Sequence, residues 1–76
     1  MTIGQNIRKY RLERGLSQAT LAAAVGTTQQ QLGVWENGHR YPNYTSLCAL
    51  CAALGVSAND LFGETEQERD DNANQE

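Results

Sequence analysis

Residues 18–35 read QATLAAAVGTTQQQLGVW, and this stretch decides the fold. A helix over 18–25 follows Ser17, and only Gly26 and Thr27 separate it from Thr28, which can cap the next helix. Gln31 stands three residues after Thr28, which is the spacing of a capping box. Two short helices joined by so tight a turn must cross steeply.

A steep, close crossing needs small side chains at the contact and a glycine at the bend. Ala22 and Gly26 stand at those places. The spacing predicts that four larger apolar residues face inward: Leu21, Val25, Leu32 and Trp35. We therefore expect a helix-turn-helix, with Trp35 in the core and not acting as a stacking platform for single-stranded nucleic acid.

Glycines followed closely by Ser or Thr recur on both sides of this stretch and predict further helix boundaries. No strand-like alternation appears, so we expect an all-α domain of five helices over residues 1–63. The predicted helices are 3–14 after Thr2, 18–25, 29–36 ending at Asn37-Gly38, 44–54 after Asn43, and a short one opened by Ser57 with Asp60. Residues 64–76 lack apolar patterning and are expected to form a flexible acidic tail.

The chain has 76 residues and room for one small core, so self-association is an open possibility. With 39% hydrophobic residues, no apolar run long enough for a bilayer and no visible secretory signal, we expect a cytoplasmic protein without membrane contact. Cys48 and Cys51 invite a redox or zinc hypothesis, but small core filler is the favoured interpretation. We expect neither catalytic residues nor a metal or cofactor, because His39 is the only histidine and no nucleophile constellation is present.

Charge is distributed unevenly along the chain. Residues 1–62 carry five basic and three acidic side chains, a net charge of +2, whereas residues 63–76 carry one basic and six acidic side chains, a net charge of -5. A mildly basic body remains compatible with nucleic acid, but it predicts modest non-specific binding. Three basic residues near the start are expected to form a solvated helix face: Arg8, Lys9 and Arg14.

One side of the helix expected after Thr28 carries no charge at all. We call it the amide face, and it consists of Gln29, Gln30, Gly33 and Asn37, with Val34 at its edge. Gln and Asn can donate and accept at once, which matches the N6 and N7 atoms of adenine, and the Val methyls suit the thymine methyl. Gly33 is costly within a helix, which makes sense if a bulkier side chain would keep the helix out of the major groove. The alternative is a neutral surface that is merely rich in glutamine.

The segments IRKYRLERGLSQATLA, AVGTTQQQLGVWENG and LCALCAALGVSANDLF make the chain from Ile3 to Phe62 resemble the phage-repressor and Cro group of helix-turn-helix proteins, the Xre type. The resemblance implies that Gln18 contacts a phosphate and braces a base-contacting residue. It implies base contacts from Gln29, Gln30, Gly33 and Val34, which follow the Thr28 cap, and phosphate contacts from Asn37, His39 and Arg40. It also implies a structural ion pair between Arg11 and Glu36.

The predicted function is a sequence-specific regulator of transcription, in the simplest case a repressor, that binds double-stranded DNA as a homodimer on a palindromic operator. The alternative is an antitoxin or adaptor that uses the same fold to bind a protein through its last helix or its tail. Two details stay open. Val56, Leu61 and Phe62 either form the dimer patch or close the core, and Tyr41 and Tyr44 either pack in their loop or contact phosphate.

Overall fold

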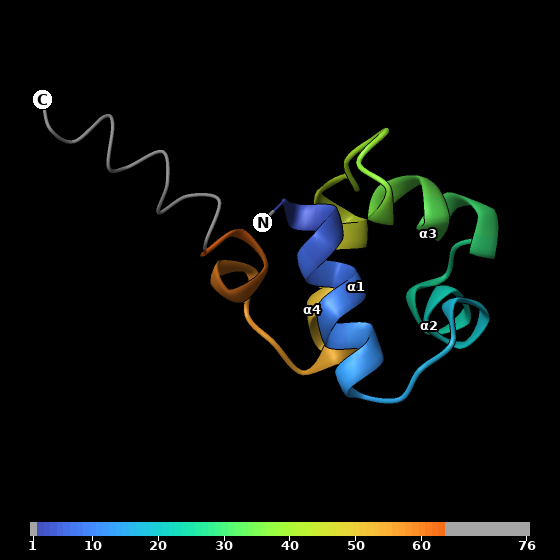
Figure 1. Cartoon of the computed structure of the whole chain (residues 1–76), viewed down its shortest axis with the longest axis horizontal. Coiled ribbons are helices and arrows are strands. Elements are labelled where there is room, and N and C mark those ends of the chain that lie inside the picture. Colours follow the sequence, from blue (N-terminus) through green and yellow to red (C-terminus); the bar gives the residue numbers. More distant parts are fainter. Residues whose placement is uncertain (1, 64–76) are drawn as a thin grey trace, which may run out of the picture.

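A computed structural model describes residues 2–63 of the chain (Figure 1). These residues form α1 (Ile3–Glu13), α2 (Gln18–Val25), α3 (Gln29–Glu36) and α4 (Tyr44–Leu54), followed by a short helical segment at 58–63. No strand occurs within this part of the chain, so the prediction of an all-α fold with five helices is confirmed. The first helix ends one residue earlier than predicted, because Arg14 is its C-cap.

Every one of the four longer helices begins at a side chain that accepts a backbone N–H from its first turn: Thr2, Ser17, Thr28 and Asn43. Thr28 accepts from the N–H of Gln31 at 3.0 Å, which is one half of the predicted capping box. The fully reciprocal box forms at Thr2 with Gln5 and again at Ser57 with Asp60. Gly26 ends α2 with φ of 85°, a left-handed conformation that a side chain would strain.

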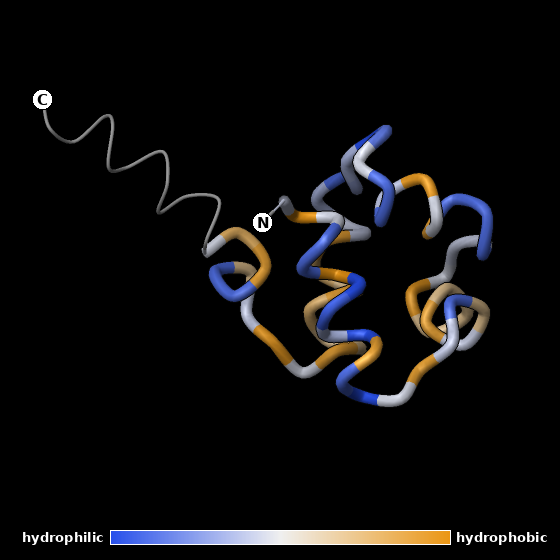
Figure 2. Tube along the Cα trace, in the orientation of Figure 1, coloured by the Kyte–Doolittle hydropathy of each residue, from blue (hydrophilic) through white to orange (hydrophobic). Residues whose placement is uncertain are grey.

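The core lies where α1, α2, α3 and α4 meet. Helix α2 packs against both α3 and α4, while α1 packs mainly against α3. Figure 2 shows the apolar stretches of α2 and α4 in orange, whereas the start of α3 and the loop after it are hydrophilic. The buried hydrophobic residues are Ile7, Leu21, Ala22, Leu32, Trp35, Leu50, Leu54 and Leu61. The prediction that Trp35 belongs to the core is therefore confirmed.

The segment at 58–63 is anchored to α1 by a buried polar contact. The side-chain amide of Asn6 donates from Nδ2 to the backbone oxygen of Leu61 at 2.6 Å, and both residues are buried. Leu61 is fully buried and Val56 packs against the core cluster. Of the two interpretations left open for these residues, closing the core is correct for Leu61 and Val56, while Phe62 is only half-buried.

The interpretation of both cysteines as core filler was wrong for Cys48, whose side chain is exposed on α4. Cys51 is half-buried and packs against the core, beside Leu50 and Leu54. The difference follows from helix geometry. Cys48 lies about 100° around the axis from Leu47, outside the apolar stripe, whereas Cys51 lies within it.

Arg14 was expected on a solvated face, but it has a structural contact as well. Its Nε donates to the backbone oxygen of Leu54 at 2.7 Å, at the end of α4 where carbonyl groups lack helical partners. Its guanidinium also lies 5.3 Å from the centre of the Tyr10 ring, and the Lys9 ammonium lies 5.2 Å from the same ring. Arg8 and Lys9 are exposed, as predicted.

The acidic tail expected at 64–76 lies outside the described residues. Within residues 2–63, no helix is long and apolar enough to cross a membrane. In the same part of the chain, no three His, Cys, Asp or Glu side chains are grouped closely enough to hold a metal ion.

Candidate nucleic-acid interface

Helix α3 presents one buried side and one exposed side. Leu32 and Trp35 are buried, whereas Gln29 and Gln30 are exposed at the first turn and the C-cap Asn37 is exposed at the other end. Gly33 and Val34 are half-buried between these two ends. The amide face predicted from the sequence is therefore a real surface of the folded chain, and it is neutral along its whole length.

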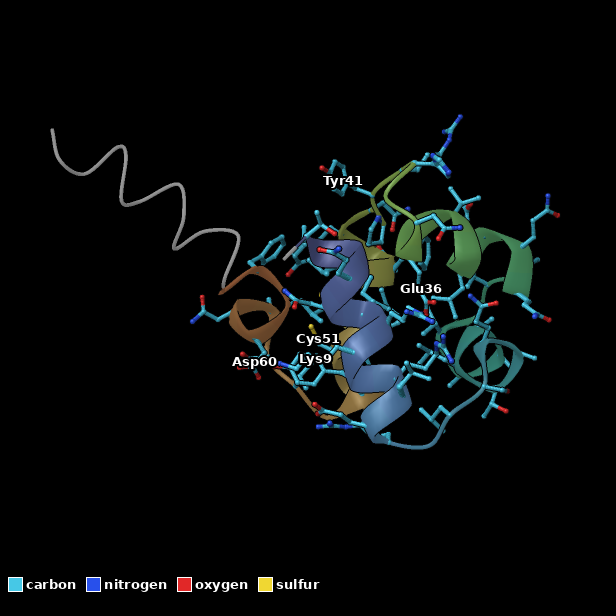
Figure 3. The ribbon with its side chains drawn as sticks, in the orientation of Figure 1. Lys9, Glu36, Tyr41, Cys51 and Asp60 are labelled. Carbon is cyan, nitrogen blue, oxygen red and sulfur yellow. The ribbon has the colours of Figure 1, made fainter. Side chains whose placement is uncertain are left out.

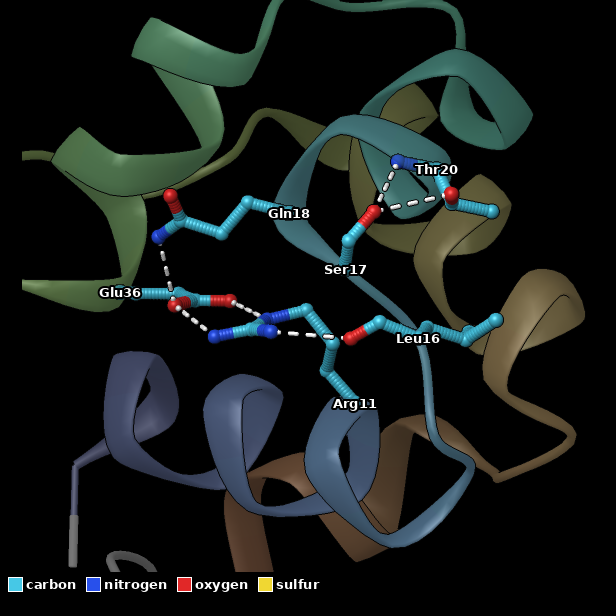
Figure 4. A network of polar contacts seen from close by, with 6 residues as sticks. All are labelled: Arg11, Leu16, Ser17, Gln18, Thr20 and Glu36. Carbon is cyan, nitrogen blue, oxygen red and sulfur yellow. Dashed lines mark hydrogen bonds and ion pairs between the residues drawn. The ribbon is translucent and has the colours of Figure 1, made fainter.

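The back of α3 is held by a buried ion pair (Figure 4). Arg11 of α1 donates from Nε to Oε2 of Glu36 at 2.6 Å and from Nη2 to Oε1 at 3.1 Å. Both residues are almost completely buried, with 7% of Arg11 and 6% of Glu36 exposed. The remaining Arg11 nitrogen, Nη1, donates to the backbone oxygen of Leu16 at 3.0 Å. This bidentate pair ties α1, the α1–α2 loop and the end of α3 to one another.

Gln18 joins the same network from the start of α2. Its Nε2 donates to Oε1 of Glu36 at 3.0 Å. A carboxylate can only accept, so this contact fixes the amide with its nitrogen toward Glu36. The hydrogen left on that nitrogen is the donor that Gln18 can offer to an anion. The resemblance implies that Gln18 braces a base-contacting residue, and the side chain it touches here is Glu36, at the far end of α3.

Gly33 lies over Gln18, with space between them. A Cβ added at Gly33 would lie 3.8 Å from Nε2 of Gln18, which is ordinary van der Waals contact. Nothing in the described part of the fold therefore excludes alanine at this position. Packing within the described residues therefore does not account for the glycine.

A polar cleft lies beside the network, where α1, the start of α2 and α3 face each other. Its walls come from all three helices and from the turn after α3, and they include Gln5, Arg8, Ser17, Gln18, Gln29 and Asn37. The sequence interpretation missed Gln5, Arg8 and Ser17 as members of this surface. Their positions along the chain carry no common motif, because three separate helices bring them together.

The loop after α3 is largely exposed to solvent. Asn37, His39 and Arg40 are exposed there, and Tyr41 and Tyr44 are 72% and 80% exposed. Figure 3 shows Tyr41 projecting from this loop, in contrast to Glu36, which points inward between the helices. Packing within the loop, one of the two interpretations considered for the tyrosines, is therefore wrong.

Thr28 is exposed at the start of α3, where its hydroxyl oxygen accepts from the N–H of Gln31. The hydroxyl hydrogen is still available to donate, because a hydroxyl can accept and donate together. The residues named from the sequence thus divide into three groups. Arg11 and Glu36 are buried behind α3, and Gln18 is half-buried between the helices. The others lie between Thr28 and Arg40 on an exposed strip in which only Gly33 and Val34 are half-buried.

Comparison with known proteins agrees with this arrangement. The helix-turn-helix family model matches residues 7–61. The uncharacterized HTH-type transcriptional regulator y4dJ of Sinorhizobium fredii is 38% identical over 65 residues, which are 86% of this chain and 84% of that protein. The immunity repressor protein of Bacillus phage phi105 is 34% identical over 64 residues, 84% of this chain but only 44% of the repressor.

Among solved structures, the P22 c2 repressor protein in complex with a synthetic operator matches with a TM-score of 0.78 and 33% sequence identity, over 80% of this chain and 92% of that one. The helices and the exposed strip therefore define a repressor-like helix-turn-helix DNA-binding domain. The chain belongs to the helix-turn-helix family, in its Xre-type phage-repressor group, and it is a DNA-binding transcriptional regulator and not an enzyme.

Proposed function

We propose that this protein is a repressor that binds a palindromic operator in double-stranded DNA as a homodimer. One observation carries the proposal: α3 presents an uncharged amide face on its outer side while the Arg11–Glu36 pair fixes its inner side. Because its inner side is fixed, α3 can enter the major groove without changing its orientation relative to the rest of the domain. Side chains on such a rigid element lose little freedom when they meet the bases.

Base recognition is assigned to the amide face. Gln29 and Gln30 are exposed at the N-terminal turn of α3, the end of a recognition helix that contacts base edges. Each amide can form a bidentate pair with adenine, and Val34 offers methyl groups to thymine. Gly33 lets the helix backbone approach the bases, which accounts for a glycine that the rest of the domain does not require.

Phosphate contacts are assigned to Asn37, at the C-terminal end of that face, and to the residues around the face. Gln18, Thr28, Asn37, His39 and Arg40 each offer at least one N–H or O–H donor beside α3. Arg8 adds a full positive charge in the polar cleft. Because Glu36 neutralises Arg11 and residues 1–62 carry a net charge of only +2, the free charge near the interface is small. Affinity should therefore fall less steeply with salt than in a strongly basic repressor.

The size of α3 supports the proposed dimer. An eight-residue helix is only about 12 Å long, so one copy contacts few base pairs. Two copies related by a two-fold axis would read half-sites about 34 Å apart on the same face of the duplex. Because each of the two half-sites is read by its own copy of α3, the dimer is more specific than a single copy with few base contacts.

Selection from a random library of duplex DNA at physiological salt, followed by sequencing of the bound fraction, tests the proposal. We expect a two-fold symmetric motif with half-sites about one helical turn apart. Sedimentation of the complex on the selected duplex should give two protein chains per DNA. A motif without symmetry, bound by one chain, would contradict the homodimer.

The antitoxin or adaptor hypothesis is the other outcome of this experiment. If the folded protein enriches no motif at all, sequence-specific DNA binding is wrong. The exposed strip would then be a surface for a protein partner. Substitution of Gln29 or Arg40 should in that case leave binding to duplex DNA unchanged, since neither residue would contact it.

A further inference from the structure

Both cysteines of the chain lie one helical turn apart on α4, and both are free thiols. Cys48 is exposed, which is unusual for a residue type that is normally among the most buried. Cys51 is half-buried and can still be reached from the surface. The function proposed above uses neither of them.

The side chains around this pair lie in one line along α4. Tyr44, Cys48 and Cys51 occur at intervals of four and three residues, which places them on the same face of the helix. The pKa of the Tyr44 hydroxyl is raised by Cys48, mainly through a side-chain hydrogen bond. The pKa of the Cys51 thiol is raised by burial, then by Cys48 and by Asp60. The three-residue spacing on α4 places the two thiols on adjacent turns of the same face, within reach of each other.

This spacing is unsuited to a disulfide but suited to a bridging atom. Cβ atoms three residues apart on a helix are separated by about 5–6 Å. A relaxed disulfide requires about 3.5–4.5 Å between them, so direct oxidation would distort α4. An atom bonded to both sulfurs lengthens the bridge by one bond and removes that conflict.

Charge and ligand number limit what the bridging atom can be. Zinc in a structural site takes four ligands, and within residues 2–63 no third metal-binding side chain is grouped with the two thiols. A complex that keeps a negative charge on the sulfurs is also disfavoured, because Cys51 is half-buried and burial disfavours a charged form. These conditions favour a thiophilic atom that needs only two sulfur ligands from the protein and whose positive charge the two thiolates cancel.

We propose that Cys48 and Cys51 form a dithiol site for a thiophilic centre of this kind, either a soft divalent metal ion or a monosubstituted trivalent arsenical. With an arsenical oxide, each thiol gives up one proton and forms one As–S bond. The oxide oxygen leaves with both protons as water. Cys48 reacts first because it is exposed, and Cys51 then closes the ring within the same molecule.

The site links consecutive turns of a single helix. It connects α4 to no other element and leaves the Arg11–Glu36 network untouched. Binding should therefore preserve the fold, and the site does not depend on the function proposed for α3.

Phenylarsine oxide is a suitable probe for the reduced full-length protein. Intact mass measurement should show one phenylarsine group per chain, retained in excess monothiol and released by a small dithiol. Cys48→Ser and Cys51→Ala should each weaken binding by about 10²-fold or more, because the second bond is intramolecular. Circular dichroism of each variant checks the fold, and Cys48→Ser changes an exposed side chain only.

Three results would overturn the proposal. The first is a single-cysteine variant that holds the probe as tightly as the unmodified chain. The second is an unmodified chain that loses the probe to monothiol as fast as the variants do, and the third is an unmodified chain that binds two probe molecules independently. Any of them would show that the cysteines act as separate thiols. The same mass measurement with mercuric ion in place of phenylarsine oxide shows whether the site also binds a soft divalent metal ion.

Discussion

Gly4 in α1 lies directly against the backbone at the end of α3, where a Cβ would come within 2.8 Å of the carbonyl oxygen of Glu36. The carbonyl oxygen of Trp35 would be closer still. Gly4 is buried and helical, so its role is to permit close approach and not to provide an unusual backbone conformation. The position of α3 therefore depends on the absence of a side chain on α1.

Replacing Gly4 with alanine should push α1 and α3 apart. Both clashing atoms belong to the backbone and cannot rotate away, so the free energy of unfolding should fall by about 1–3 kcal/mol. Urea unfolding followed by circular dichroism measures the change. An unchanged midpoint would mean that the two helices are less closely packed than this contact requires.

Gly33→Ala is the matched control, because it adds the same methyl group to a helix without a clash. It should raise the free energy of unfolding by up to about 1 kcal/mol, since alanine favours helix more than glycine does. Affinity for the selected operator should nevertheless fall by about tenfold or more, a loss of about 1.4 kcal/mol of binding free energy. Unchanged affinity would remove Gly33 from the interface.

Glu36→Gln should destabilise the domain strongly. It leaves the guanidinium of Arg11 buried without its counter-charge, a change that costs about 3–5 kcal/mol in comparable buried pairs. Gln18→Ala removes only one hydrogen bond to the same carboxylate and should cost about 1 kcal/mol. Denaturant unfolding of both variants checks this order, and equal losses would contradict a central role for the ion pair.

Gln29→Ala and Gln30→Ala should each relax the preference at a defined base pair by about 1–3 kcal/mol, because they remove a bidentate contact. Arg40→Ala should instead weaken binding to all sequences alike and make affinity less sensitive to salt. Titration of each variant against operators with single base-pair changes separates these effects. If the Gln substitutions weaken binding to all of these operators equally, those side chains contact the phosphate backbone and not the bases.

Neutralising the six acidic residues at 64–76 by Glu→Gln and Asp→Asn changes in the full-length chain should increase DNA affinity. The reason is that these side chains are negatively charged, as the DNA phosphates are, and therefore repel the duplex at low salt. The increase should disappear at high ionic strength, where charges more than a few ångströms apart are screened. If the substitutions instead abolish the function of the protein, the tail binds a partner protein.

Local sequence determined the helices of this protein. The caps at Ser17 and Thr28, the bend at Gly26 and the spacing of Leu32 and Trp35 act over four residues or fewer, so they can be recognised in a single stretch. The amide face follows from the same periodicity. The helix-turn-helix family model, which matches residues 7–61, covers all of these local patterns.

Tertiary structure alone decided the contacts between residues that are distant in sequence. Gly4 touches α3 and Asn6 holds the backbone of Leu61, although neither residue has a local pattern that predicts its partner. Arg14 is exposed as expected, but it also donates to the backbone oxygen of Leu54, 40 residues away, a contact that no local pattern predicts. Helical periodicity shows which side of a helix is buried, but the pairing of two buried sides depends on how the helices cross, and only the folded chain fixes that geometry.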